Sequence, residues 1–586
     1  MSKLPSLQNV IKATQRTVLR FPLETLTAIL GTIFAIILQE KKYGGPQEFY
    51  IKAVMSCSLC LILFLSVSLY FQASKKSNLL RFLSSFILGS LLIAFVFSFK
   101  KNITDVEAQE FLVLNIALHL LVSFAGFLPK TYHQEEFWEF NKQLFLRILT
   151  AGLYSMVLYC GLALAILAIE KLFGFEFYDR IYLYIFFTIT GVFNTIFFLN
   201  GVPETNNQEN PLQLSYPKGL KNFTQFILLP LISLYLIILI CYEAKILITL
   251  SLPVGWVSYL VLVFAIFGIL SFLLVHPIAN EKGNLWMKTF NRWFYFLLIP
   301  LLGLLFWAIL YRINLYGFTH ERYYVLLLSI WLGVVVLYFL IQKQPKIKFI
   351  PISMCLAGLF SIVGPQSANS VSKNSQLSRF QSYIQKDKAK KLTFEQEQDF
   401  SSIVSFLEEN YGVEIMVPYA EKELKPLLKK DKFPSDYEIM KALGYEYRSM
   451  YEEKEDTSIN YSYYENDQTS IQNIHGFDMS FHLSDNSKFE CIDCIKIENK
   501  SYSIYAKTKD YGTDLTINGE VVPLKIIPFI NENTGFGSHP TDQKITQLIE
   551  TDKYRILLTY LNVSGELEKK KKVITYYQIK VMIGVK

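Results

Sequence analysis

Two polar residues stand inside long apolar runs, where their chemistry is unusual. They are His119 and Asn194. An ionisable or amide side chain is costly in hydrocarbon, so each is a candidate for a proton relay or a ligand contact. The alternative interpretation is structural: a neutral imidazole or an amide hydrogen-bonds to a neighbouring helix and joins the two helices. We favour the structural interpretation and keep His119 and Asn194 as a candidate intramembrane polar site.

A short charged turn separates two apolar runs in the middle of the chain. Gly317 permits a tight reversal, and Thr319 is placed to N-cap the next helix. Glu321 then falls in the first helical turn, where the helix dipole favours a carboxylate. Arg312, Glu321 and Arg322 are either ordinary helix-end charges or a small cluster that binds an ion or docks a domain. Charges at helix ends are common in membrane proteins, which favours the first interpretation.

The C-terminal region carries two weaker signals for chemistry. Cys491 and Cys494 have redox spacing, but they lie in a strand-like run, whereas a thioredoxin-type pair opens a helix. Without a second pair a zinc site is poorly supported, so we expect a simple disulfide in an oxidising compartment or two free thiols. His475, Asp478 and His482 have the spacing of alternating strand positions, which argues against a metal site.

No stretch resembles a nucleophile elbow, a P-loop or paired catalytic carboxylates. We therefore predict no catalytic residue, no cofactor and no metal ligand. The chain is 52% hydrophobic and only 18% charged, which is too apolar for an ordinary soluble protein of 586 residues. Its net charge of +7 is spread out, with no dense basic tract, so nucleic acid is not an expected partner.

Eleven apolar runs make up most of the first 365 residues, and most approach the roughly 20 residues that span a bilayer as a helix. They predict an α-helical polytopic membrane protein with about 11 transmembrane helices. The first run, with a glutamate near its start, and the last, which is short, are the weakest. The runs cover residues 21–38, 50–72, 82–99, 109–128, 144–169, 181–200, 223–242, 256–275, 293–311, 323–341 and 349–363.

The loops predict an orientation. Lys and Arg are more numerous on the side of the N-terminus, which the positive-inside rule makes cytoplasmic. With eleven spans the C-terminal region lies outside the cytoplasm, although one miscounted span would reverse this conclusion.

The remainder of the chain predicts a soluble α+β domain. Residues 366–455 combine a polar linker, at 365–375, with three amphipathic helices, two of which begin at capping boxes. Residues 456–586 are β-rich. Asn518-Gly519 between two strand-like runs predicts a two-residue hairpin, and Tyr554–Leu561 with Val573–Ile583 predicts a final one.

Several stretches together resemble a bacterial family of multi-pass membrane proteins, domain-of-unknown-function family 4153. The resemblance covers most of the chain and implies an envelope protein, and it assigns no catalytic residue. The stretches that carry it are Arg20-Phe-Pro-Leu-Glu24, Gly191-Val-Phe-Asn194, Tyr216-Pro-Lys-Gly219, Leu252-Pro-Val-Gly-Trp256, His276-Pro277, Arg312-Ile-Asn-Leu-Tyr316-Gly317-Phe-Thr319-His-Glu-Arg322 and Ile474-His-Gly476-Phe477-Asp478.

We expect a non-enzymatic protein of the bacterial inner membrane, whose helical bundle anchors an extracytoplasmic domain that senses a signal or binds an envelope protein or glycan. The bundle is poor in buried charge and the C-terminal region has its own apolar residues, which motivates this hypothesis. One alternative is a transporter or channel for a small solute or ion, with His119 and Asn194 along the path. A third is a membrane enzyme acting on lipid-linked substrates, which would need acidic or histidine residues gathered at one membrane face.

Overall fold

The computed structural model describes residues 7–41, 47–129, 133–204, 212–249, 256–277, 285–385, 391–429, 434–451, 458–463, 474–485, 489–509, 512–532, 544–568 and 571–586. Its contacts divide the chain into two compact units, Met1–Tyr447 and Arg448–Lys586, which are described separately. The predicted boundaries were 365/366 and 455/456, and the second of these lies outside the described residues.

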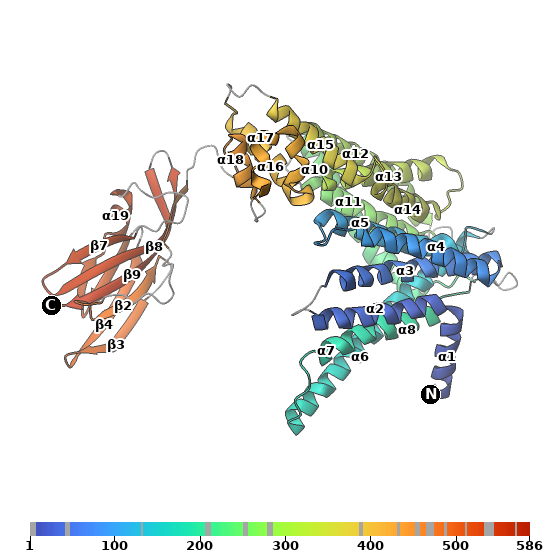
Figure 1. Cartoon of the computed structure of the whole chain (residues 1–586), viewed down its shortest axis with the longest axis horizontal. Helices are drawn as coiled ribbons and strands as arrows, with labels where there is room; N and C mark the ends of the chain where they lie inside the picture. Colours follow the sequence, from blue (N-terminus) through green and yellow to red (C-terminus); the bar gives the residue numbers. More distant parts are fainter. Residues whose placement is uncertain are drawn as a thin grey trace. The chain divides into compact units, whose positions relative to one another are not determined.

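Long apolar helices build the first unit (Figure 1). Among the described residues, nine helical spans are long and apolar enough to cross a membrane, and the two other predicted runs form shorter apolar helices. Their helices are α2 (Pro22–Glu40), α3 (Glu48–Ser74), α4 (Asn78–Phe97), α5 (Asp105–Ala125), α6 (Gln134–Phe173), α7 (Ile181–Phe187) with the π-helix η2 (Thr188–Phe193) and α8 (Asn194–Asn200), α9 (Lys218–Phe223) with the π-helix η3 (Thr224–Leu228) and α10 (Leu229–Thr249), α11 (Trp256–Val275), α12 (Leu285–Tyr316), α13 (His320–Ile341) and α14 (Phe349–Ile362).

The outward side chains of these helices indicate a bilayer. On α6, Leu153, Val157 and Leu164 are each more than half exposed, and they belong to an apolar surface too continuous for water. A short helix that precedes the bundle, α1 (Leu7–Arg20), is instead amphipathic, as is typical of helices that lie in the membrane interface. The predicted fold class, a polytopic α-helical membrane protein with a C-terminal domain, is confirmed.

Hydrogen bonds at the two ends of α3 define two faces of the bundle. At its C-terminal end, Gln72 accepts a hydrogen bond from Arg20, which ends α1, at 3.1 Å. At its N-terminal end, the Lys52 Nζ donates to the carbonyl of Phe99, just before α5, at 2.7 Å. Because α3 crosses the bundle, Arg20 and the start of α5 lie at opposite faces.

Helix α14 runs back along α5 and fixes the face at which the next helix begins. Its 14 residues are about 21 Å long, shorter than the hydrocarbon core of about 30 Å. Lys348, before α14, donates to the carbonyl of Phe127 beyond the end of α5, at 3.1 Å. Asn369, after α14, donates to Glu110 in the first turns of α5, at 3.2 Å. The segment after α14 therefore lies at the face opposite Arg20, whatever the number of spans.

The prediction of a polar linker at 365–375 was wrong, because most of this segment is helix. Ser367 caps α15 (Ala368–Ile384) by accepting a hydrogen bond from the amide of Ser370. The buried face of α15 begins with small polar side chains, Ser372 and Gln376 among them, so its composition resembles that of a loop. Gln376 and its neighbour Ser375 contact backbone groups of the bundle instead of an apolar core.

Helix α15 packs with three further helices into a small helical cap on the first unit. Capping boxes begin α16 (Phe394–Tyr411) and α18 (Asp436–Leu443), and glycines end both helices, as the sequence predicts. A short helix, α17 (Glu421–Leu424), lies between them. The core of the cap contains Phe380, Phe400 and Met440, all fully buried. We use "helical cap" for α15–α18.

The second unit is a β domain in which two antiparallel sheets share one apolar core (Figure 1). Asn518 and Gly519 have the positive φ angles of a two-residue hairpin turn, and β8 pairs with β9, so both predicted hairpins are confirmed. Among the described strands, the order is β1-β8-β9-β2 with β7 also on β8 in one sheet, and β3-β4-β5-β6 in the other. The elements are β1 (Ser458–Ser462), β2 (Met479–Ser484), β3 (Phe489–Ile497), β4 (Lys500–Lys509), β5 (Gly512–Ile517), β6 (Glu520–Pro523), α19 (Ile526–Glu532), β7 (Ile545–Glu550), β8 (Tyr554–Glu568) and β9 (Lys571–Val585).

Residues 448–586 should fold without the rest of the chain. Both sheets contribute to the same core, where Ile504, Leu515, Ile556 and Ile579 are at most 1% exposed. A unit with its own apolar core is expected to unfold cooperatively. The purified fragment should give a strand-dominated circular dichroism spectrum and a single thermal transition. Aggregation, or a spectrum of unfolded chain, would show that the β domain needs the first unit.

Candidate functional site

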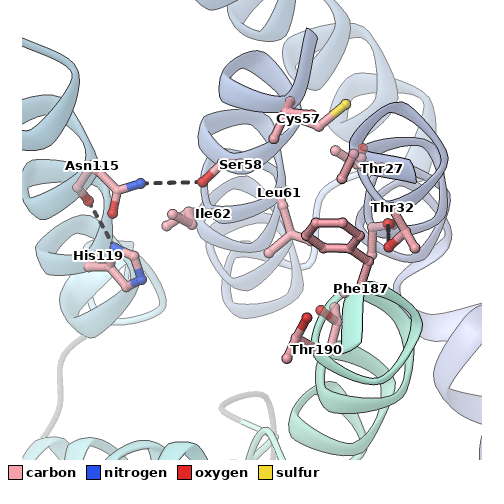
Figure 2. A pocket seen from close by; sticks show the side chains of 16 residues that line it. Thr27, Thr32, Cys57, Ser58, Leu61, Ile62, Asn115, His119, Phe187 and Thr190 are labelled. Atoms are coloured by element: carbon pink, nitrogen blue, oxygen red, sulfur yellow. Dashed lines mark hydrogen bonds between the residues drawn. The ribbon is translucent and has the colours of Figure 1, made fainter. Parts of the chain in front are cut away.

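A cavity of about 390 Å³ lies within the bundle, between α2, α3, α5 and the π-helix η2. Figure 2 shows Asn115 and His119 of α5 at one side of it, and Phe187 and Thr190 at the other. Leu61 of α3 projects into the space between them. The cavity thus combines apolar walls with hydroxyl, amide and imidazole groups at membrane depth.

One polar cluster joins α3 and α5 at this cavity. The Asn115 Nδ2 donates to the Ser58 hydroxyl at 3.4 Å, and His119 Nδ1 lies 2.9 Å from the carbonyl of Asn115 (Figure 2). A carbonyl only accepts, so Nδ1 carries the proton, and in the neutral tautomer Nε2 is an acceptor. His119 is exposed toward the cavity, with its Nε2 available to a ligand.

The threonines around the cavity present oxygen lone pairs. The hydroxyls of Thr27, Thr32 and Thr190 each donate to the carbonyl four residues earlier, at 2.7–2.8 Å. Their protons are therefore committed to their own helices, and the oxygens can only accept further hydrogen bonds.

Close helix contacts and a π-helical turn shape the cavity wall. A Cβ on Gly191 would lie 2.0 Å from the Thr32 hydroxyl oxygen, so only glycine lets η2 approach α2 this closely. On the other side of α2, a Cβ on Gly31 would lie 3.1 Å from the Cβ of Cys57 on α3. π-Helical turns are rare and are frequently found at functional sites. The geometry of η2 has no counterpart in the sequence pattern.

A second cavity of about 410 Å³ adjoins the first and shares His119, Leu61, Ile62 and Thr195 with it. Asn194 lines the second cavity, so the structure brings the two predicted intramembrane residues to neighbouring spaces. The Asn194 Oδ1 accepts a hydrogen bond from Ser155 of α6 at 3.3 Å. Asn194 therefore joins two helices, and His119 faces both cavities.

A buried ion pair near the face of Arg20 was missed by the sequence analysis. Glu24 is fully buried, Arg81 is 7% exposed, and the Arg81 Nη2 lies 3.6 Å from the Glu24 Oε2. Ser68 donates to the other carboxylate oxygen, and Arg81 also donates to the carbonyl of Arg20 at 3.0 Å. The sequence signal is present, since Glu24 interrupts the first apolar run, but a glutamate near the start of a run equally indicates a weak span. Its partner, Arg81, directly precedes the run 82–99, where a loop charge is equally expected.

The charged turn between α12 and α13 forms a second candidate site, which we call the turn platform (Leu315–His320). Gly317 has φ +69°, and a Cβ there would lie 2.8 Å from the Cδ of Arg379. Thr319 caps α13 by accepting a hydrogen bond from the amide of Arg322. The turn thus has the predicted conformation, and glycine is needed both for φ and for the approach of α15.

Cationic and amide side chains converge on the carbonyls of the turn platform. The end of a helix leaves carbonyls without intrahelical partners, and cations there also complement the helix dipole. Gln376 donates to the carbonyls of Tyr316 and Phe318 at 2.9 and 2.8 Å, and Arg379 donates to those of Tyr316 and Leu315. The amide of Phe318 in turn donates to the Ser375 hydroxyl at 2.9 Å. The helical cap is therefore held to the bundle through backbone groups.

Two more interactions complete this contact. Arg379 bonds both oxygens of Asp399 at 2.6 Å, which links α15 to α16. His320 Nε2 lies 3.0 Å from the Tyr411 hydroxyl, which donates to the carbonyl of Asn369. Burial, and secondarily the charge of Glu110, raises the pKa of Tyr411, so its hydroxyl keeps the proton that it donates. The imidazole must then be the donor toward Tyr411.

Of the three predicted cluster residues, one takes part in the turn platform. Arg322 donates to the carbonyls of Tyr316 and Gly317 at 3.1 and 3.0 Å. The described residues offer no hydrogen-bond or ion-pair partner to the side chain of Arg312 or Glu321, although both lie close enough to Arg322 to act on its charge. The contacts to the cap come from Gln376 and Arg379, which the sequence places only on an amphipathic helix.

The chemistry available at these sites is binding and orientation. Within the described parts of the chain, no three His, Cys, Asp or Glu side chains are grouped so that they could hold a metal ion. The cavity offers neutral acceptors, and the turn platform offers backbone carbonyls that are already bonded.

Comparison with known proteins gives three findings. The family described as "Domain of unknown function (DUF4153)" matches residues 59–392, which run from α3 to just before α16 and include the turn platform and α15. Over 240 residues the chain is 28% identical to "Uncharacterized protein PM1469" of Pasteurella multocida (strain Pm70), a stretch that covers 41% of this chain and 40% of that protein. The match therefore spans less than half the length of either chain. No solved structure matches the chain.

Proposed function

This chain belongs to the DUF4153 family, and from that premise we propose that it is a bacterial inner-membrane protein whose helical bundle holds the C-terminal region outside the cytoplasm. There the helical cap and the β domain would sense a signal or bind an envelope partner, either a protein or a glycan. In this proposal the bundle anchors the C-terminal region in the membrane and has no catalytic role.

The observation that carries the proposal is the hydrogen bond between Asn369 and Glu110. It puts the start of the cap at the face opposite Arg20, independently of the span count on which the sequence argument depended. The excess of Lys and Arg at the face of Arg20 supports a cytoplasmic assignment for that face. Among the described residues after α14, no helix is apolar enough to cross back. The cap and the β domain then share the extracytoplasmic side.

The cysteines support the same compartment. Cys491 in β3 is disulfide-bonded, whereas the five cysteines of the bundle are free. The side chain of Cys494, the expected partner, lies outside the described residues. Disulfides persist in oxidising compartments such as the bacterial periplasm and are rare in the cytosol.

The turn platform supports a role as a mount. Gln376 and Arg379 bind carbonyls at the end of α12, and the family match includes both residues and the turn. The cap is thereby hydrogen-bonded to the bundle, which is what a mount requires. This is the docking role proposed for the charged turn, with Arg322 as its contributor from the predicted cluster.

Reporter fusions test the compartment. A reporter enzyme that is active only outside the cytoplasm should be active when fused after Lys586 and silent when fused after Lys76, in the loop between α3 and α4. A fusion after Lys101, between α4 and α5, should be active and serves as the matched control for a loop position. Activity at Lys76 with silence at Lys586 and Lys101 would place the C-terminal region in the cytoplasm and end the proposal.

A further inference from the structure

The first cavity carries an inference about a ligand. None of the described residues that line it is Asp, Glu, Lys or Arg, and the same is true of the adjoining cavity. A charged ligand at this depth would find no counter-charge, and isolated charges are expensive within a membrane. The ligand that fits these walls is uncharged.

Five polar groups of the cavity are acceptors, whereas the hydroxyls of Ser58 and Thr195 can also donate. The acceptors are Nε2 of the neutral His119 ring, Oδ1 of Asn115 and the oxygens of Thr27, Thr32 and Thr190. The Asn115 amide reaches Ser58, so the amide group contributes its oxygen to the cavity. A ligand that satisfies this set must bring its own donors, as a hydroxyl group does.

Exposed apolar side chains beside the cavity favour an opening toward lipid. His119 shares a face of α5 with Leu112 and Ile116, which precede it at helical spacing and are 57% and 47% exposed. Ala35, Leu61 and Phe187 add apolar wall beside the polar groups. A fully polar solute would leave hydrogen-bonding groups unpaired against these walls, which is costly.

We propose that this cavity binds an uncharged lipid alcohol that enters from the bilayer. Its hydroxyl donates to Nε2 of His119 or Oδ1 of Asn115, and its chain lies along Leu61 and Phe187. A volume of about 390 Å³ suits the head and first part of such a chain, and the opening lets the remainder extend into lipid.

Photolabelling of the full chain in lipid nanodiscs tests the proposal. The probe is a long-chain alcohol with a diazirine in its chain, and the matched control probe is the fatty acid of the same length. The alcohol should label peptides from α3, α5 or η2 saturably, and excess unlabelled alcohol should compete. The acid should label them about tenfold less, because it brings a charge that the walls do not pair. Labelling that never saturates, or that is equal for acid and alcohol, would overturn the proposal.

Variants assign the labelling to the cavity. Asn115→Leu with His119→Leu should reduce labelling about tenfold, since the ligand hydroxyl loses both acceptors to which it can donate its one hydrogen bond. His133→Leu makes the same imidazole change at an exposed position outside the cavity and should leave labelling unchanged. If the double variant does not yield folded protein, Ala35→Leu provides the second test, because it keeps every polar group and narrows the cavity. Undiminished labelling of whichever variant is folded would refute the site.

Discussion

Arg81→Ala should lower the free energy of unfolding by about 3–5 kcal/mol, the largest effect that we expect from a single substitution. Glu24 is fully buried and takes its charge compensation from Arg81, with Ser68 on its other oxygen. Removing the guanidinium leaves the buried carboxylate with the Ser68 hydroxyl, a backbone amide and the charge of Arg20, none of which replaces the ion pair. Detergent-solubilised protein titrated with sodium dodecyl sulfate, with helicity as the readout, measures the change.

The control for this result is a substitution of Glu24, the partner of Arg81. Glu24→Gln keeps the size of the side chain and removes its charge, so Glu24→Gln combined with Arg81→Ala should be at least about 1 kcal/mol more stable than Arg81→Ala alone. Lys101→Ala removes an exposed charge between α4 and α5 and should change stability by no more than about 0.5 kcal/mol. If Arg81→Ala resembled Lys101→Ala, the pair would not be a structural element of the bundle.

Arg379→Ala should loosen the helical cap without unfolding the bundle. The substitution removes hydrogen bonds to two carbonyls of the turn platform and leaves Asp399, 18% exposed on its side chain, without its cation. We expect the free energy of local opening of α15 to fall by about 3 kcal/mol, because one partner of a largely buried pair is lost. Hydrogen–deuterium exchange of peptides from 368–385 should then be about a hundredfold faster.

Arg312→Ala is the matched control for Arg379→Ala. It also removes a guanidinium near the turn platform, but the described residues give Arg312 no hydrogen-bond or ion-pair partner, so exchange in α15 should stay as in the unmodified chain. Peptides from α5 report on damage to the bundle itself and should exchange equally in all three proteins. Equal exchange of α15 in both variants would mean that Arg379 does not hold the cap.

Sequence reasoning succeeded where neighbouring residues determine the structure. The capping box of Thr393 and Gln396 and the turn at Asn518-Gly519 are set by side chains within a few positions of each other. The eleven apolar runs follow from composition alone, because a bilayer requires helices of about 20 apolar residues. The turn at Gly317 is also predictable from the local sequence, since it needs a residue with a positive φ angle.

The same reasoning failed where distant segments meet. Nothing local shows that Glu24 pairs with Arg81, or that Gln376 and Arg379 bind carbonyls of the turn platform. His119 can be recognised from its position deep in an apolar run. The threonine hydroxyls that line the same cavity cannot, because their position depends on how η2 packs against α2. A single π-helical turn leaves no trace in hydrophobic periodicity.

The polar underside of α15 determines how the helical cap can leave the bundle. Its contacts with the turn platform are made by Ser375, Gln376 and Arg379, whereas Phe380 and Leu377 face the cap's own core. Separation from the bundle would expose mainly hydrophilic groups of α15, together with Phe406, whose ring stacks on His320, and would leave the core around Phe380 closed, so the separated cap should remain folded. When the cap separates from the bundle, water can therefore replace each of the hydrogen bonds that it loses.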